Sequence, residues 1–141
     1  MIVLAYDHRA YKLMIKIKDY LAKIGEQYVE FASSEYDAKD SYAQFAKQAN
    51  KYMVEHPDAK GIYSCRTGIG IAMAGNRQKG VRAGVCQSVK TTFLARNDDD
   101  MNVLVLPATT CFCKVKKIIK TFLNTPFEGG RHTDRVNALD N

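Results

Sequence analysis

Short apolar runs alternate along this chain with segments whose apolar residues recur at helical spacing. The runs, which we expect to form strands, cover residues 2–6, 28–32, 61–64, 81–86 and 102–107. Between the first two, Leu13, Ile17 and Leu21 fall on one side of a helix that Gly25 ends. Further helical patterns cover residues 42–53, 71–76, 88–96 and 110–123. Strands that alternate with helices pack in layers, so few architectures remain open to this chain.

The predicted fold is α/β: a single Rossmann-like, doubly wound domain over residues 1–141. Parallel neighbouring strands need a long crossover, which a helix supplies, and such crossovers are right-handed. We therefore expect a five-stranded, mostly parallel sheet with helices on both faces. A length of 141 residues suits one domain.

The distribution of apolar residues indicates where in the cell this protein is located. No run approaches the roughly 18 consecutive apolar residues of a membrane span. The first residues, MIVLAYDHRA, lack the basic start and small-residue cleavage site of a signal peptide. We expect a cytoplasmic protein with no membrane partner.

A formal net charge of +6 raises the possibility of nucleic-acid binding. Lysines in residues 12–23 and 114–120 alternate with apolar positions, which favours a solvated helix face over a binding stripe. The same charge could steer a phosphorylated small substrate towards the protein. No nucleic-acid-binding motif is present, so we expect no nucleic-acid partner.

The four cysteines form no CxxC pair and, with only three histidines, no recognisable zinc pattern. We expect free thiols rather than disulfides, with Cys86, Cys111 and Cys113 as packing residues. The sequence thus predicts no metal site.

A glycine-rich loop, CRTGIG (residues 65–70), follows the third strand and opens a helix. Ligands of open parallel sheets bind beyond the carboxyl ends of the strands, where this loop lies. Gly68 and Gly70 let backbone N–H groups approach a ligand, and the helix N-terminus adds partial positive charge. Such a loop suits a phosphate or an oxyanion formed during a reaction. It is neither a GxGxxG fingerprint nor a P-loop.

Cys65 heads this loop, and two interpretations stay open. A thiol beside a helix start and Arg66 favours the reactive thiolate. Alternatively, Cys65 is a buried residue at the end of a strand.

Two other polar pairs are candidates. Asp7 and His8 follow the first strand at the same sheet edge, either as site residues or as a helix cap. Arg131 and Arg135 are four residues apart in the tail. They could hold a phosphate through paired guanidiniums, or lie on an exposed helix face.

Taken together, these pieces resemble the type B ribose-5-phosphate isomerases, a family that includes the galactose-6-phosphate isomerase subunits. Asp7-His8 resembles that family's DH after its first strand. The stretch CRTGIGIAMAGNRQKGVRAGVC is similar to its CGTGxGI…AxNKxxGIRAxxC segment, and FEGGRHTDRV to its YEGGRHxxRV. The NVL at residues 102–104 matches a further strand, so the resemblance covers almost the whole chain.

The resemblance implies interconversion of an aldose and a ketose phosphate through a cis-enediolate. Cys65 would be the base, Thr67 and the Gly68 and Gly70 amides would stabilise the enediolate, and Asp98 would act as an acid or base. The implied substrate-binding residues are Asp7, His8, Arg66, Gly68, Ile69, Gly70, Asp99, Arg131 and Arg135. No metal or organic cofactor is implied. A homodimer or homotetramer that shares the site across an interface is expected.

This chain departs from the family pattern at several positions. Arg66 stands where the family has glycine, and Asp98 and Asp99 stand where it has a ring-opening histidine and an asparagine. The family's DYP is represented by Ser41-Tyr42-Ala43.

Ribose 5-phosphate and ribulose 5-phosphate are the expected pair. A different aldose, such as galactose 6-phosphate, and a non-catalytic sugar-phosphate-binding subunit remain as alternatives.

Overall fold

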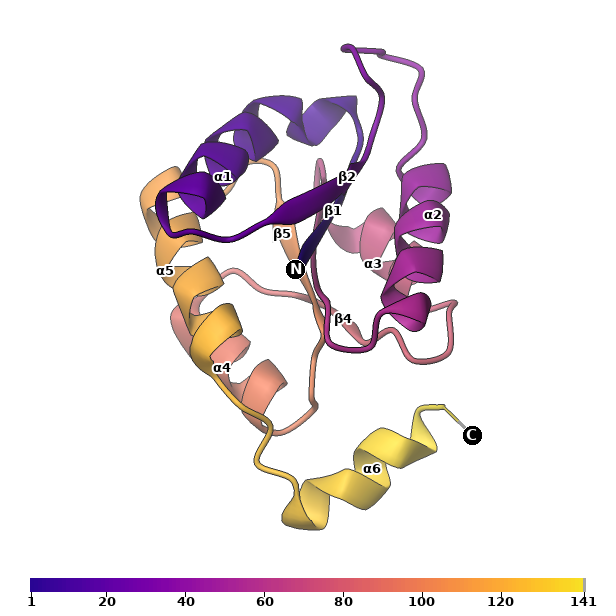
Figure 1. Ribbon diagram of the computed structural model, residues 1–141, viewed down its shortest axis with the longest axis vertical. Helices are drawn as coiled ribbons and strands as arrows, with labels where there is room; N and C mark the ends of the chain where they lie inside the picture. Colours follow the sequence, from indigo (N-terminus) through magenta and orange to yellow (C-terminus); the bar gives the residue numbers. More distant parts are fainter. Residues whose placement is uncertain (141) are drawn as a thin grey trace.

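Five parallel strands form one sheet in the computed structural model, which describes residues 1–140. The strands are β1 (Ile2–Tyr6), β2 (Tyr28–Phe31), β3 (Lys60–Cys65), β4 (Ala83–Val85) and β5 (Val103–Pro107). Their order across the sheet is β2-β1-β3-β5-β4. Every neighbouring pair is parallel, which confirms the predicted α/β sheet (Figure 1).

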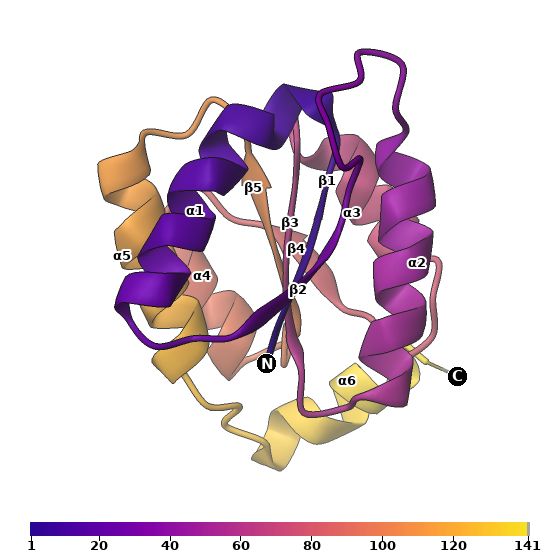
Figure 2. The ribbon, with the colours of Figure 1, turned by 45° about the horizontal axis from the view of Figure 1, so that its top comes forward.

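Helices cover both faces of the sheet. They are α1 (Tyr11–Lys23), α2 (Tyr42–Glu55), α3 (Ile69–Gly75), α4 (Val89–Asn97), α5 (Phe112–Asn124) and α6 (Thr133–Ala138). Helices α1, α4 and α5 pack on one face, and α2 and α3 on the other (Figure 2). Among the described residues, no helix is long and apolar enough to cross a membrane.

Each central strand contributes to two separate cores. Along β1, Leu4 faces the α1 and α5 side while Val3 faces the α2 and α3 side, and both are fully buried. Ile62 and Tyr63 divide in the same way on β3. A strand buried on both faces must be apolar throughout, which is why these runs do not alternate with polar residues.

The strand order reverses between β1 and β3. From β1 the chain turns outward to the edge strand β2, whereas β3 has β5 on its other side. Tyr6 pairs with Ser64 in the register of the two strands. Asp7, which follows β1, and Cys65, which ends β3, therefore lie at the same carboxyl edge, where ligands of such sheets bind.

A buried polar link holds α3 in place. The Asn50 amide on α2 donates to the Gly75 carbonyl at 3.1 Å and to the Ala74 carbonyl at 3.3 Å. The Tyr63 hydroxyl donates to Asn50 Oδ1 at 3.1 Å. One side chain thus connects a central strand and two helices, including the helix that the glycine loop opens.

Replacing Asn50 by alanine is expected to lower the free energy of unfolding by about 2–3 kcal/mol, because it strands a buried hydroxyl and a buried carbonyl. Urea unfolding measures the change. Gln48→Ala, at an exposed position on the same helix, should change stability by less than about 0.5 kcal/mol. Equal losses in the two variants would contradict this account.

Candidate active site

The loop after β3 is tied to the end of β5. Cys65 is buried at the last position of β3, and Ala108 N–H donates to its carbonyl at 3.0 Å. Thr67 Oγ1 accepts the Ile69 N–H at 3.3 Å, so its hydroxyl lies beside the first turn of α3. The structure thus places the thiol, the hydroxyl and a helix start together.

Two glycines allow close approaches that a side chain would prevent. Gly68 has a φ of +78°, and a Cβ there would lie 3.1 Å from Val105 Cγ1. A Cβ on Gly70 would lie 2.7 Å from the Tyr42 hydroxyl oxygen. The Tyr42 ring therefore packs directly on the loop, a contact that no pattern in the sequence indicates.

Asp7 is a cap and also a member of the carboxyl-edge cluster. It is buried, and its Oδ1 accepts the Arg9 N–H at 3.0 Å at the start of a 3₁₀ turn. The cap interpretation is therefore confirmed. Burial raises the pKa of this carboxyl, and the Asp40 charge adds to the effect.

His8 is oriented by a residue from a distant segment. Its Nδ1 lies 2.7 Å from Asp40 Oδ1, and its backbone N–H donates to the same oxygen at 3.0 Å. The Ser33 hydroxyl lies 3.3 Å from the other Asp40 oxygen. This arrangement leaves His8 Nε2 as the ring nitrogen that can meet a ligand. Asp40 lies in a polar loop without a recognisable motif. Its contact with His8 therefore becomes visible only in the folded structure.

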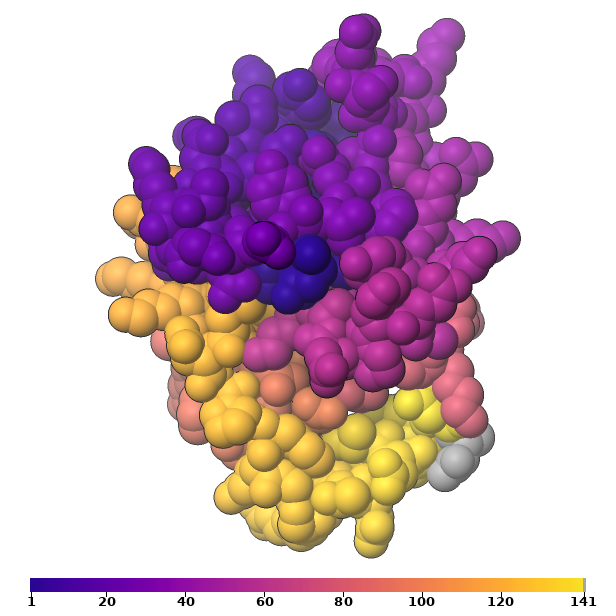
Figure 3. Space-filling view, in the orientation of Figure 1, coloured from indigo at the N-terminus to yellow at the C-terminus, as the bar shows by residue number. Residues whose placement is uncertain are grey.

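The remaining predicted residues lie at the other end of the sheet. Asp98 and Asp99 precede β5, whereas Cys65 is paired with Pro107 at the strand's far end. A five-residue strand at roughly 3.3 Å per residue separates the two ends by about 13 Å. Arg131 and Arg135 lie in and beside α6, at the bottom of the molecule in Figures 1 and 3.

The structure therefore divides the predicted site residues into two groups. The carboxyl-edge group contains Asp7, His8, Cys65, Arg66, Thr67, Gly68, Ile69 and Gly70. The amino-edge group contains Asp98, Asp99, Arg131 and Arg135. Within one chain, the two groups do not meet.

A charged network shapes the amino-edge group. Asp100 accepts from Arg82 at 2.7 Å and from Arg96 at 2.9 Å. The φ of Asp100 is +46°, in the left-handed region, and its two ion pairs hold it there. Asp99 lines a cavity of about 520 Å³ together with Arg77 and Arg82. The third aspartate of the DDD run is thus structural, whereas Asp98 and Asp99 take no part in these two ion pairs.

The expectation for the other cysteines was partly wrong. Cys86 is buried as expected, and burial raises its pKa. Cys111 and Cys113 are exposed at the start of α5, with their sulfurs 2.9 Å apart. Packing was expected because neither cysteine has a glycine loop beside it as Cys65 does, but both thiols precede the stripe that α5 buries.

Nearly the whole chain matches one known family and several of its members. A family model described as Ribose/Galactose Isomerase matches residues 2–139. The probable ribose-5-phosphate isomerase B of Mycoplasma pneumoniae is 35% identical, over 98% of this chain and 91% of that protein.

Solved structures agree. A ribose 5-phosphate isomerase from Thermotoga maritima superposes with a TM-score of 0.93 at 35% identity, covering 99% of this chain and 96% of that one. Ribose-5-phosphate isomerase B from Mycoplasma genitalium, solved with bound ribulose-5-phosphate, gives a TM-score of 0.92 at 36% identity, covering 98% and 92%.

The raised pKa of Asp7 predicts a pH-dependent stability. Because its folded-state pKa lies above the unfolded value, ionisation of Asp7 removes stability as pH rises through that window. In Asp7→Asn the amide oxygen can still accept the Arg9 N–H. We expect this variant to gain stability relative to the parent between acid and neutral pH, as measured by urea unfolding across pH. A difference that stays constant with pH would refute the assignment.

Proposed function

Because the chain belongs to the ribose/galactose isomerase family, we propose that it interconverts ribose 5-phosphate and ribulose 5-phosphate as a cytoplasmic enzyme. The observation that carries this proposal is the match over the whole chain to ribose-5-phosphate isomerases, one of them solved with ribulose-5-phosphate. The glycine loop headed by Cys65 supports the same chemistry.

In the proposed reaction, the Cys65 thiolate takes a proton from C2 of the open-chain sugar and returns it to C1. The electron pair left on C2 forms the C1–C2 double bond of the cis-enediolate and places negative charge on O1, and a proton passes from the C2 hydroxyl to O1 before C1 is protonated. The first N–H groups of a helix have no partner within the helix, so the start of α3 offers donors to that oxygen. The Thr67 hydroxyl lies in the same turn.

The carboxyl-edge group has further roles in this proposal. Asp7 would contact the sugar hydroxyls, which a buried, protonatable carboxyl can do as donor or acceptor. His8, held by Asp40, would contact the phosphate through Nε2. Arg66 and Ile69 are exposed on the loop, where Arg66 adds positive charge.

We further propose that the active enzyme is a homodimer, or a tetramer of such dimers. A second copy would bring its Asp98, Asp99, Arg131 and Arg135 to the Cys65 loop of the first. In support, apolar side chains are exposed on the two helices that follow β3 and β4: Ile69, Met73, Val89, Phe93 and Leu94. Large exposed apolar side chains on neighbouring elements favour a protein–protein contact.

Asp98 and Asp99 also motivate a second candidate function. A carboxylate at residue 98 could still move a proton during ring opening, but a pair of carboxylates repels a phosphate. Isomerisation of another aldose, such as an unphosphorylated sugar or galactose 6-phosphate, is therefore the alternative. The missing ring-opening histidine motivates a further one, sugar-phosphate binding without catalysis. Turnover of ribose 5-phosphate by the purified chain decides between them.

Cys65→Ala is expected to lower ketose formation from ribose 5-phosphate by at least about 10²-fold, because the variant lacks the base. Cys86→Ala, which removes another buried thiol, is the matched control and should keep most of the activity. Similar losses in both variants would argue against Cys65 as the base.

If each active site uses residues of both chains of a dimer, mixing two inactive variants should restore activity. Cys65→Ala and Arg135→Ala are each expected to be weakly active alone. After mixing and subunit exchange, half of the dimers should be mixed, and each would hold one intact site. We expect about a quarter of the parent activity to return. No recovery, with exchange verified by mass spectrometry, would mean that one chain supplies the whole site.

A further inference from the structure

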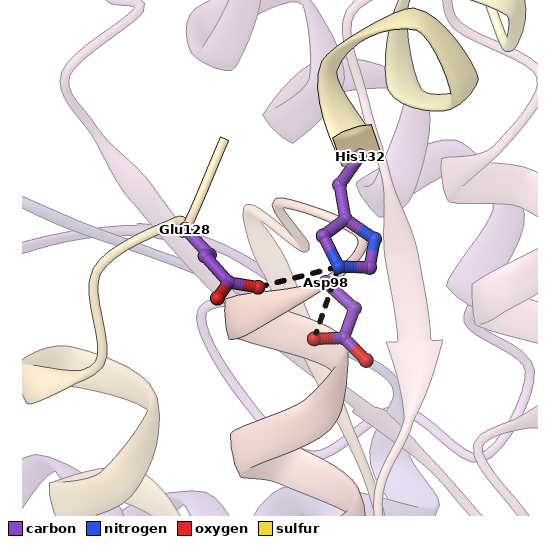
Figure 4. A group of neighbouring side chains, drawn as sticks. All are labelled: Asp98, Glu128 and His132. Carbon is purple, nitrogen blue, oxygen red and sulfur yellow. Dashed lines mark ion pairs between the residues drawn. The ribbon is translucent and has the colours of Figure 1, made fainter. Parts of the chain in front are cut away.

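Three side chains from separate segments converge outside the Cys65 loop. Asp98 follows α4, and Glu128 lies in the tail after α5. His132 ends a 3₁₀ turn over Gly130–His132. One oxygen of each carboxylate and Nε2 of the imidazole all lie within 4.8 Å of one another. Figure 4 shows the three side chains pointing towards a common centre.

The imidazole nitrogen at this centre is buried but unsatisfied. His132 is 5% exposed, and its Nε2 has no hydrogen-bond partner among residues 1–140. Nε2 lies 3.3 Å from Glu128 Oε2 and 3.8 Å from Asp98 Oδ1, within ion-pair distance of both when the imidazole is protonated, yet it makes a hydrogen bond with neither. A buried nitrogen left in this way is costly unless something else occupies its lone pair.

Both donor spacings to the imidazole nitrogen are close to those around a bound ion, and the two carboxylate oxygens lie within 4.8 Å of each other. Zn²⁺ binds nitrogen and oxygen ligands at about 2.0–2.2 Å. Two ligand atoms on one such ion therefore lie roughly 3–3.5 Å apart. The nitrogen-to-Glu128 distance already falls in this range, and the Asp98 distance exceeds it by a few tenths of an ångström. A cation would also remove the repulsion between the two carboxylates.

Asn97 holds both carboxylates in position. Its side-chain amide lies 2.8 Å from Asp98 Oδ1 and 3.3 Å from Glu128 Oε2, the same oxygens that face His132. Its backbone carbonyl accepts the Glu128 N–H at 2.9 Å. Outer-shell hydrogen bonds of this kind orient the ligands of a metal.

We propose that Asp98, Glu128 and His132 bind a divalent first-row transition-metal ion such as Mn²⁺ or Zn²⁺. One imidazole nitrogen and two carboxylate oxygens suit these ions, whereas a site of oxygens alone would suit Ca²⁺ or Mg²⁺. The Glu128 side chain is 59% exposed, so the ion can enter from solvent and keep water at its open positions. The proposal goes beyond the isomerase reaction, and an ion held by Asp98 would replace the acid–base role proposed for that residue.

The test is titration of the full chain, after treatment with a chelator and dialysis, with Mn²⁺ followed by electron paramagnetic resonance. Binding removes the signal of the free ion, and we expect saturation at a single ion per chain. Mn²⁺ is the probe because it prefers oxygen and nitrogen ligands, which minimises binding to the exposed Cys111 and Cys113. The bound ion should also broaden the imidazole proton resonances of His132 and not those of His56.

Variants identify the ligands. Glu128→Gln and His132→Asn should each weaken Mn²⁺ binding by at least about tenfold. The control His56→Asn changes an exposed imidazole that stacks on Tyr52 and should leave binding unchanged. Since Glu128 is exposed, its variant keeps the result interpretable if His132→Asn unfolds. Absence of saturable binding, or equal binding by the parent and Glu128→Gln, would overturn the proposal.

Discussion

The parallel pairing of β1, β3 and β5 is the constraint on which the rest of this structure depends. These strands are buried on both faces, so their side chains fill two cores and fix the helices on each side. The register also decides which loops meet: Tyr6 opposite Ser64 brings Asp7 to the Cys65 loop. A site at this edge follows from the pairing because the carboxyl ends of parallel strands all point the same way.

The same pairing separates the two groups of predicted site residues. Residues that follow a strand lie at the carboxyl edge, and residues that precede a strand lie at the amino edge. Asp98 precedes β5 and Cys65 ends β3, so no local adjustment brings them together within one chain. A second copy can close this gap, which makes oligomerisation part of the proposed chemistry. The Asp98–Glu128–His132 cluster likewise owes its place to the amino edge.

Sequence reasoning missed the residues that act through contacts between distant segments. Asp40 meets His8 only because the loop after β2 folds back over the first turn. Tyr42 meets Gly70 because α2 and α3 pack on the same face. Glu128 and His132 are four residues apart, but their separation from Asp98 along the chain matches no zinc-binding motif. Cys111 and Cys113 were expected to be packing residues, yet they are exposed just before the buried stripe of α5.

By itself, the sequence determined the order and approximate bounds of the strands, the α/β layers and the loop with Cys65, Thr67 and two glycines. It could do so because apolar periodicity and glycine positions are local signals. It left open the short helix α6, the division of the site between the two edges and the partners of His8 and His132. Only the tertiary structure decided these, because each depends on which distant segments the two cores bring into contact.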